Sequence, residues 1–420
     1  MSEKHLKKPN KTGPAGKAKE PKPPKEPKPP KKAKAPKEPK PPRFRQEETP
    51  EQRMSRRDRL RVILGLIAIA LLVAAAVVVY LMRDSFQTDP LSLIAPSAPK
   101  ADAEYLFDTS SGQCFASAGR GFAVATSSSL ELFDENGQVA ASRLVQMETP
   151  AIAACSEYAV FYDIGGLNIA AAYFDGSVRE LSPVGSIFSA TVSDSGYLAL
   201  TTECAGYRGL VTVYDPTLEP IYQWYSSSAW IISAEVSPDG RSLAVLSYTA
   251  AGSEVRLFDL NKTEQRAAFS VSDTVLLDAH WFSTSLLCTY SADQAYFFDG
   301  DGHWTGTGDF EDRFLIDCAF GDGFVVFALS QYRAGTASTL VAYDANAKKL
   351  GTAELQSELI SLAASGTEAL ALCPDSATLY TSTLAEKGTL SGLTGFKYGL
   401  LRGRGEALLI SSGFAEVHSF

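Results

Sequence analysis

The feature that most constrains this chain is a short phrase that recurs about every 40 residues after residue 120. Each phrase ends in two residues, mostly apolar or aromatic, followed by aspartate, and successive aspartates are 41, 40, 44, 40 and 45 residues apart. The aspartates are Asp134, Asp175, Asp215, Asp259, Asp299 and Asp344. Such a period indicates a repeat architecture, in which each unit buries its apolar face against its neighbours.

Each repeat is expected to consist of short β-strands. Ahead of every aspartate lies a short apolar run, such as FAVAT (122–126) or FVVFALS (324–330), and no long segment with a 3.6-residue period interrupts the series. The aspartate itself is interpreted as structural, because aspartate tolerates turn conformations and bonds its own backbone. Four-stranded units of this length are typical of the blades of a β-propeller, so we predict an all-β fold.

The number of blades follows from the number of apolar runs. Two further runs, EALALC (368–373) and EALLISS (406–412), bring the count to eight blades, with seven as the alternative. The last unit is one strand short, whereas an unassigned strand opens the series at 103–107. Because an unclosed ring exposes two long sheet edges, we predict that 103–107 completes the last blade.

Two neighbouring repeats match each other without a gap. Residues 189–196 read SATVSDSG, and residues 233–240 read SAEVSPDG. A Ser-Pro-Asp-Gly turn followed by an apolar strand, and then by a strand ending in aromatic-Asp, resembles the repeats of WD40-like, YVTN-like and quinoprotein-like propellers. Full Trp-Asp and Gly-His signatures are absent. The resemblance covers about residues 103–420 and implies a fold, not an activity.

The segment 62–82 is expected to form a transmembrane helix. Its 21 residues carry no charge, and at 1.5 Å per residue they would span about 31 Å, the thickness of a bilayer core. A cleaved signal peptide has a shorter apolar region and a small-residue cleavage site, which this segment lacks at its end. Five arginines lie within residues 53–61, directly before this segment. The positive-inside rule therefore predicts a single-pass membrane protein with a cytoplasmic N-terminus and an extracytoplasmic C-terminal part.

The two sides of this segment differ in charge. Residues 1–61 hold 21 Lys and Arg against 8 Asp and Glu, a net of +13, whereas the remainder holds 18 against 40, a net of −22. The Pro/Lys-rich stretch has too few apolar side chains to form a core, so 1–61 is predicted to be a disordered cytoplasmic tail. It would act as a solvated spacer, adhere to anionic lipid, or dock a Pro-reading domain. Binding of nucleic acid is not predicted, because the body is acidic and the tail lacks aromatic residues before Phe44.

The predicted organisation is therefore a tail (1–61), a membrane helix (62–82), a linker (83–102) and an extracytoplasmic propeller (103–420). This layout resembles a Gram-positive family of unknown function that joins a Lys/Pro-rich tail, one membrane anchor and a propeller. The six cysteines form no CxxC pair and lie in apolar strand-like runs. Buried free thiols are the favoured interpretation, and disulfides remain the alternative because an extracytoplasmic site permits them.

Candidate binding residues lie on the first strand of several repeats, where polar residues alternate. Because a period of two places such residues on one face of a strand, and first strands line the channel of a propeller, we expect them to converge there. They are Glu235, Asp278, His280 and Asp317. Two interpretations stay open, a hydrated channel lining and a site for a ligand or cation. Only four histidines occur in the chain, which excludes a His-rich metal site, and no cofactor is predicted.

The leading functional hypothesis is a non-enzymatic scaffold or sensor that binds envelope or membrane proteins. No GxSxG, HExxH or P-loop motif occurs. The longer connections at 204–209, 249–254 and 332–338 are predicted contact surfaces, because loops on a rigid disc commonly carry binding residues. The alternative is a channel-mouth enzyme, a hydrolase or a lyase, or a propeller that binds a glycan or small ligand.

Overall fold

The computed structural model describes residues 101–107 and 112–420. The predicted tail (1–61), the predicted membrane helix (62–82) and nearly all of the linker (83–102) lie outside the described residues. Within the described part, no helix has both the length and the apolar character needed to cross a membrane.

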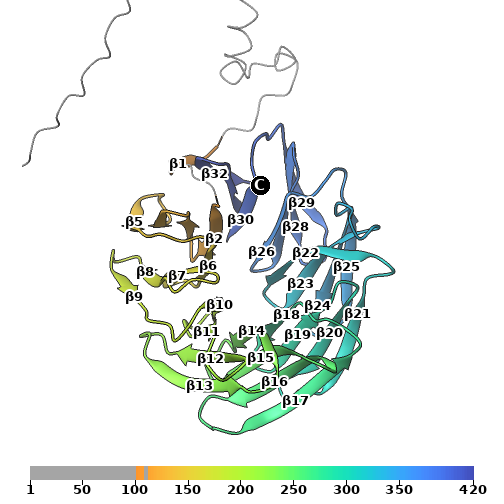
Figure 1. Ribbon diagram of the computed structural model, residues 1–420. Coiled ribbons are helices and arrows are strands. Elements are labelled where there is room, and N and C mark those ends of the chain that lie inside the picture. The colour runs from red at the N-terminus through yellow and green to blue at the C-terminus, as the bar shows by residue number, and fades with distance from the viewer. Residues whose placement is uncertain (1–100, 108–111) are drawn as a thin grey trace, which may run out of the picture. The chain divides into compact units, whose positions relative to one another are not determined.

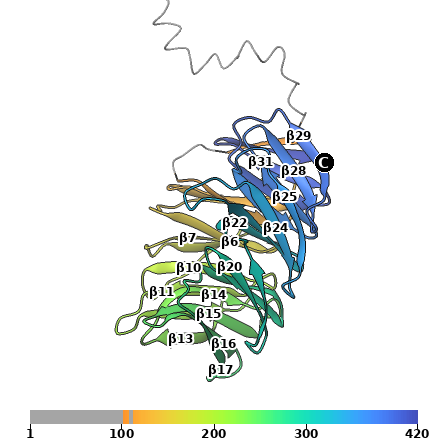
Figure 2. The ribbon, with the colours of Figure 1, turned by 90° about the vertical axis from the view of Figure 1, so that its right-hand side faces the viewer.

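The described residues form eight antiparallel four-stranded sheets, which are the blades of a propeller (Figure 1). The first strand of each blade lies nearest the centre of the ring, and the first strands of most neighbouring blades contact one another. The prediction of an all-β propeller with eight blades is confirmed, and the seven-bladed alternative is excluded. Figure 2 shows the propeller turned by 90°, with neighbouring blades packed side by side.

Blades 1 to 4 each consist of four consecutive strands. Blade 1 contains β2 (Cys114–Ala118), β3 (Gly121–Ala125), β4 (Ser129–Phe133) and β5 (Val139–Leu144). Blade 2 contains β6 (Pro150–Ala154), β7 (Tyr158–Asp163), β8 (Ile169–Tyr173) and β9 (Val178–Glu180). Blade 3 contains β10 (Ile187–Val192), β11 (Leu198–Thr202), β12 (Gly209–Tyr214) and β13 (Pro220–Ser226). Blade 4 contains β14 (Trp230–Val236), β15 (Ser242–Thr249), β16 (Gly252–Asp259) and β17 (Gln265–Ser272).

Blades 5 to 7 follow the same plan, and blade 8 combines the two ends of the propeller. Blade 5 contains β18 (Asp278–Ser283), β19 (Leu286–Tyr290), β20 (Gln294–Asp299) and β21 (Trp304–Asp309). Blade 6 contains β22 (Phe314–Gly321), β23 (Phe324–Ser330), β24 (Thr339–Asp344) and β25 (Lys349–Glu354). Blade 7 contains β26 (Ser361–Ser365), β27 (Glu368–Leu372), β28 (Ser376–Thr381) and β29 (Glu386–Ser391). Blade 8 contains β30 (Tyr398–Gly403), β31 (Glu406–Ile410), β32 (Phe414–Ser419) and β1 (Ala103–Leu106).

The antiparallel order gives the propeller two different faces. The turn face carries the connections from first to second strand and from third to fourth strand in each blade. The loop face carries the connections from second to third strand and the links between blades. Strand β1 begins at the turn face, because Ala103 lies opposite Val417, near the end of β32. The chain therefore enters the propeller and ends at the same face.

The hydrophobic core lies between the blades. One cluster, for example, joins Tyr158 and Val160 of blade 2 to Ile187, Leu198 and Leu200 of blade 3. Equivalent clusters occupy the other interfaces, including the one between blades 8 and 1. Because each blade buries apolar side chains on both faces, its second strand is an almost continuous apolar run, as the sequence showed.

The recurring aspartates have the structural role predicted for them. Asp134 accepts hydrogen bonds from the backbone N–H groups of Asn136 and Gln138, each at 2.8 Å. Asp344 receives the same pair of bonds from Asn346 and Lys348 at 2.9 Å. Each carboxylate thus closes the turn between the third and fourth strands, which explains why it follows the third strand at a regular interval.

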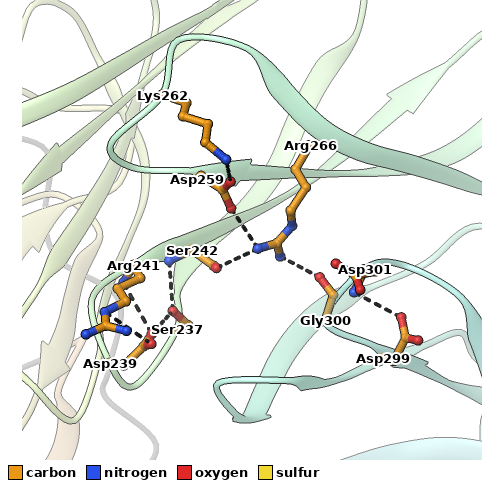
Figure 3. Close-up of polar contacts among 10 residues, drawn as sticks. All are labelled: Ser237, Asp239, Arg241, Ser242, Asp259, Lys262, Arg266, Asp299, Gly300 and Asp301. Atoms are coloured by element: carbon orange, nitrogen blue, oxygen red, sulfur yellow. Dashed lines mark hydrogen bonds and ion pairs between the residues drawn. The ribbon is translucent and has the colours of Figure 1, made fainter.

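Arg266 connects two of these turns in neighbouring blades (Figure 3). From β17 it donates to Asp259 Oδ1 at 2.8 Å and to Ser242 Oγ at 3.1 Å, both in its own blade. It also donates to the carbonyl oxygen of Gly300, in the turn between β20 and β21 of blade 5, at 2.5 Å. A planar guanidinium can serve several acceptors at once, so this residue adds a polar link to the apolar contact between blades 4 and 5.

Strand β1 closes the ring, as predicted for 103–107. Tyr105 stacks on Phe122 of blade 1 with ring centroids 5.9 Å apart, and Arg402 Nη1 donates to its hydroxyl at 3.2 Å. The ring also occupies the space beside Gly137, where an added Cβ would lie 1.9 Å from the Tyr105 ring and where φ is +73°. Only glycine allows this turn and this close approach together.

Replacing Tyr105 by alanine is expected to lower the free energy of unfolding by about 3 kcal/mol, because it removes a buried ring and leaves a cavity. The side chain of Tyr105 is 8% exposed, whereas that of the neighbouring Leu106 is 74% exposed. Leu106→Ala is therefore the matched control, with an expected change within about 0.5 kcal/mol. Urea denaturation measures both, and equal effects of the two substitutions would contradict closure through Tyr105.

Candidate functional site

A cavity of about 280 Å³ opens at the turn-face end of the central channel. Its walls are the ends of the first strands of blades 3 to 7 (β10, β14, β18, β22 and β26) and the turns that follow them. Several of its lining residues are small, including Gly321, Ala364, Ser365 and Gly366. These small residues, from blades 6 and 7, leave space in the cavity beside the larger side chains of blades 4 to 6.

Two of the four predicted site residues meet in this cavity. Glu235 on β14 and His280 on β18 form an ion pair, with Oε1 and Nδ1 3.0 Å apart. Their side chains are 16% and 33% exposed, so the pair is shielded without being closed off from solvent. The indole of Trp281 donates to the carbonyl oxygen of Glu235 at 3.2 Å and fixes β14 against β18.

Burial and the ion pair shift the pKa of each group in opposite directions. Burial raises the pKa of Glu235, and His280 partly offsets that rise. Burial disfavours the charged form of His280, but the carboxylates of Glu235, Asp278 and Asp194 outweigh it and raise the pKa of the imidazole above 6.5. The positive form of His280 is therefore more favoured in the folded protein than in a free imidazole.

An aromatic wall stands beside the ion pair. The ring of His280 packs against Phe320 of β22 with centroids 4.0 Å apart. Phe282 lies 5.5 Å from Phe320, centroid to centroid, in an edge-on arrangement. All three rings line the cavity together with the carboxylates of Asp194, Glu235 and Asp322.

The remaining predicted site residues, Asp278 and Asp317, lie outside the lining of the cavity. Asp278 is near enough to influence the pKa of His280, and its Oδ1 accepts the N–H of Ala279 at 2.8 Å. Asp317 accepts the N–H of Cys318 at 2.8 Å. Burial raises the pKa of Asp317, while the backbone of Cys318 and of Leu362 in the next blade opposes the rise. The structure thus brings Glu235 and His280 together and ties Asp317 to neighbouring backbone.

The lining residues that were not predicted include two carboxylates and two phenyl rings, those of Asp194, Asp322, Phe282 and Phe320. The two aspartates follow the first strands of their repeats, at β10 and β22. A comparison of the turns after each first strand, and not only of the strands, would have found them. Phe282 and Phe320 carry no sequence signal of their own, because apolar residues are common throughout these strands.

The cysteines are all unpaired. Burial raises the pKa of the Cys114 thiol to about 11 and that of the Cys318 thiol to about 12, so neither is an activated nucleophile. Within the described ranges, no group of three or more His, Cys, Asp or Glu side chains is placed to hold a metal ion.

A second surface lies on the loop face of blades 3 and 4 and consists of Tyr207, Arg208, Tyr225, Trp230 and Tyr248, here called the aromatic patch. The rings of Tyr207 and Tyr225 are 4.9 Å apart, and the guanidinium of Arg208 lies 4.8 Å from the centroid of Trp230. Trp230 stands opposite Tyr248 in the β14–β15 pair. The four ring side chains are 43% to 53% exposed.

The aromatic patch belongs to a wider asymmetry between the two faces. Among the described residues, the exposed large hydrophobic side chains lie at or next to the loop-face ends of strands, with three exceptions. The exceptions are Val139, Ile221 and Trp304. The connections predicted as contact surfaces, 204–209, 249–254 and 332–338, also lie on the loop face and include Tyr207 and the exposed Tyr332.

The fold is that of an eight-bladed β-propeller. Residues 100–387 match the model of a family of unknown function, DUF5711, and the chain belongs to that family. No curated protein matches the sequence.

Solved structures resemble the propeller in fold. The C-terminal WD40 domain of Sif2 is 9% identical and has a TM-score of 0.57, over 76% of this chain and 98% of that chain. A crystal structure of the eukaryotic initiation factor is 12% identical and has a TM-score of 0.51, over 76% of this chain and 83% of that chain. At these identities the likeness concerns the fold alone.

The His280–Glu235 pair predicts a pH dependence of stability. Because the pKa of His280 is raised in the folded state, its contribution is fully present below about pH 6.5 and is lost as the pH rises through the folded-state pKa. The free energy of unfolding should therefore fall as the pH rises above about 6.5, and His280→Gln should flatten this fall. Urea denaturation at several pH values measures it, with the exposed His303→Gln as control. An unchanged pH profile in His280→Gln would contradict the role of the pair.

Proposed function

We propose that the protein is a membrane-anchored propeller that binds partner proteins in the cell envelope through its loop face. The observation that carries this proposal is the aromatic patch. Tyrosine, tryptophan and arginine are the residues most enriched at the energetic centres of protein interfaces. Tyr207, Arg208, Tyr225 and Trp230 place these residue types together on one exposed surface.

The scaffold suits such a surface because it holds the patch rigidly. Trp230 is the first residue of β14 and Tyr225 lies next to the end of β13, so both are fixed by strand pairing. The backbone N–H of Arg208 donates to the carbonyl oxygen of Ser226 at 2.7 Å. This bond fixes the loop between β11 and β12 against the end of β13. Side chains held in place before binding lose little conformational entropy on association.

The proposed anchor is compatible with this surface. The uncharged segment 62–82 would cross the membrane, and the chain enters the propeller at the turn face. A tether attached there leaves the loop face accessible to partners in the extracytoplasmic space. The basic tail 1–61 would stay on the cytoplasmic side, where anionic lipid is an available partner.

Proximity labelling in live cells tests the proposal. A labelling enzyme fused after Phe420 should enrich a small set of envelope or membrane proteins, relative to the same enzyme on an anchor without a propeller. Trp230→Ala should remove most of this enrichment, since loss of a central interface aromatic costs about 2 kcal/mol or more. Trp304→Ala is the matched control, because Trp304 is also exposed, at 64%, but lies away from the loop face.

Two outcomes would contradict the proposal. Labelling of cytoplasmic proteins would show that the propeller lies on the other side of the membrane. Equal enrichment in wild type and Trp230→Ala would show that the aromatic patch is not the binding surface.

A further inference from the structure

We propose that the channel-mouth cavity binds an organic ammonium group through the carboxylates that line it, Glu235 among them, and beside the aromatic wall of Phe282 and Phe320. This site lies on the turn face and goes beyond the protein-binding function proposed for the loop face. Neither proposal depends on the other.

The charges around the cavity favour a cation. Three carboxylates line it, those of Asp194, Glu235 and Asp322, and they face one histidine, His280. No lysine or arginine occurs among the described lining residues. Even with His280 positively charged, the lining keeps a net negative charge, and a recessed mouth with low-dielectric walls strengthens its field.

Glu235 has capacity for a further donor. A carboxylate offers about four lone-pair positions, and Oε1 is used by His280 Nδ1 at 3.0 Å. A guest with N–H donors would use the remaining positions of this carboxylate.

The aromatic wall favours an organic cation over a metal ion. An ammonium group is attracted to the face of a phenyl ring, and its methylene groups lose apolar surface against that ring. Calcium and magnesium instead require six or more oxygen ligands, counting water. A volume of about 280 Å³ accommodates a short alkylamine, because a water molecule takes up only about 30 Å³.

An alkylammonium group has two sources, a free amine or the lysine side chain of a partner protein. The experiment uses probes for both: butylamine and putrescine for the free amine, and Nα-acetyl-lysine methylamide for the side chain. 1-Butanol is the uncharged control for butylamine, and magnesium chloride is the control for a site that takes any cation. Binding to the purified full-length protein is measured by calorimetry and by tryptophan fluorescence, since Trp281 lines the cavity.

We expect butylamine to bind, and we expect no binding of 1-butanol or magnesium. Glu235→Gln should weaken butylamine at least about tenfold, as expected for loss of a charge-assisted hydrogen bond. Glu203→Gln, which removes an exposed carboxylate near the loop face, should change nothing. Phe320→Leu, which keeps the charges, should also weaken binding and serves as the second variant if Glu235→Gln lowers the unfolding midpoint.

The probes also separate the two sources. Equal affinity for butylamine and Nα-acetyl-lysine methylamide assigns the site to a lysine side chain, whereas exclusion of the lysine derivative assigns it to a free amine. The proposal is overturned if butylamine binds no better than 1-butanol, if magnesium competes equally, or if Glu235→Gln and Phe320→Leu both bind butylamine as wild type does. These results do not bear on the loop face, which is tested by Trp230→Ala.

Discussion

The pairing of β1 with β32 is the contact on which the rest of the propeller depends. Every blade buries apolar side chains on both of its faces, so a ring open between blades 8 and 1 would expose Phe122, Phe133 and Leu408 to water. The N-terminal strand prevents this by supplying the fourth strand of blade 8. Arg402 and Arg120 reinforce the closure, because each bonds groups of both blades 8 and 1.

Closure also separates two kinds of surface. At the turn face, aspartates and arginines bond backbone groups and the chain enters beside its own C-terminus. At the loop face, exposed aromatic side chains such as Trp230 and Tyr332 accumulate. The proposed protein-binding surface and the proposed ammonium site therefore lie at opposite ends of the same strands, with β14 contributing Trp230 to one and Glu235 to the other.

The fold could be predicted because its determinants are local and repeated. In each repeat, the aspartate at the end of the third strand indicates the same turn. The apolar run of the second strand indicates the same buried position. The meeting of Glu235 with His280 followed from the period of the strands, but the contact of His280 with Phe320 did not. That contact depends on the distance between two blades, which no short pattern encodes. The aromatic patch was predicted only in part, through the connection 204–209 that holds Tyr207, because Tyr225 and Trp230 come from separate elements.

A disulfide across the closing strands tests the closed ring most directly. Glu104 and Glu416 lie opposite each other in the β1–β32 pair, at a separation that a disulfide can bridge. The double variant Glu104→Cys and Glu416→Cys is oxidised and digested without reduction, and cross-linked peptides are identified by mass spectrometry. A closed eight-bladed ring predicts a bridge between residues 104 and 416 in most molecules, and a weaker yield when Leu106→Cys replaces Glu104→Cys. Free thiols at both positions, or equal yields in the two registers, would contradict it.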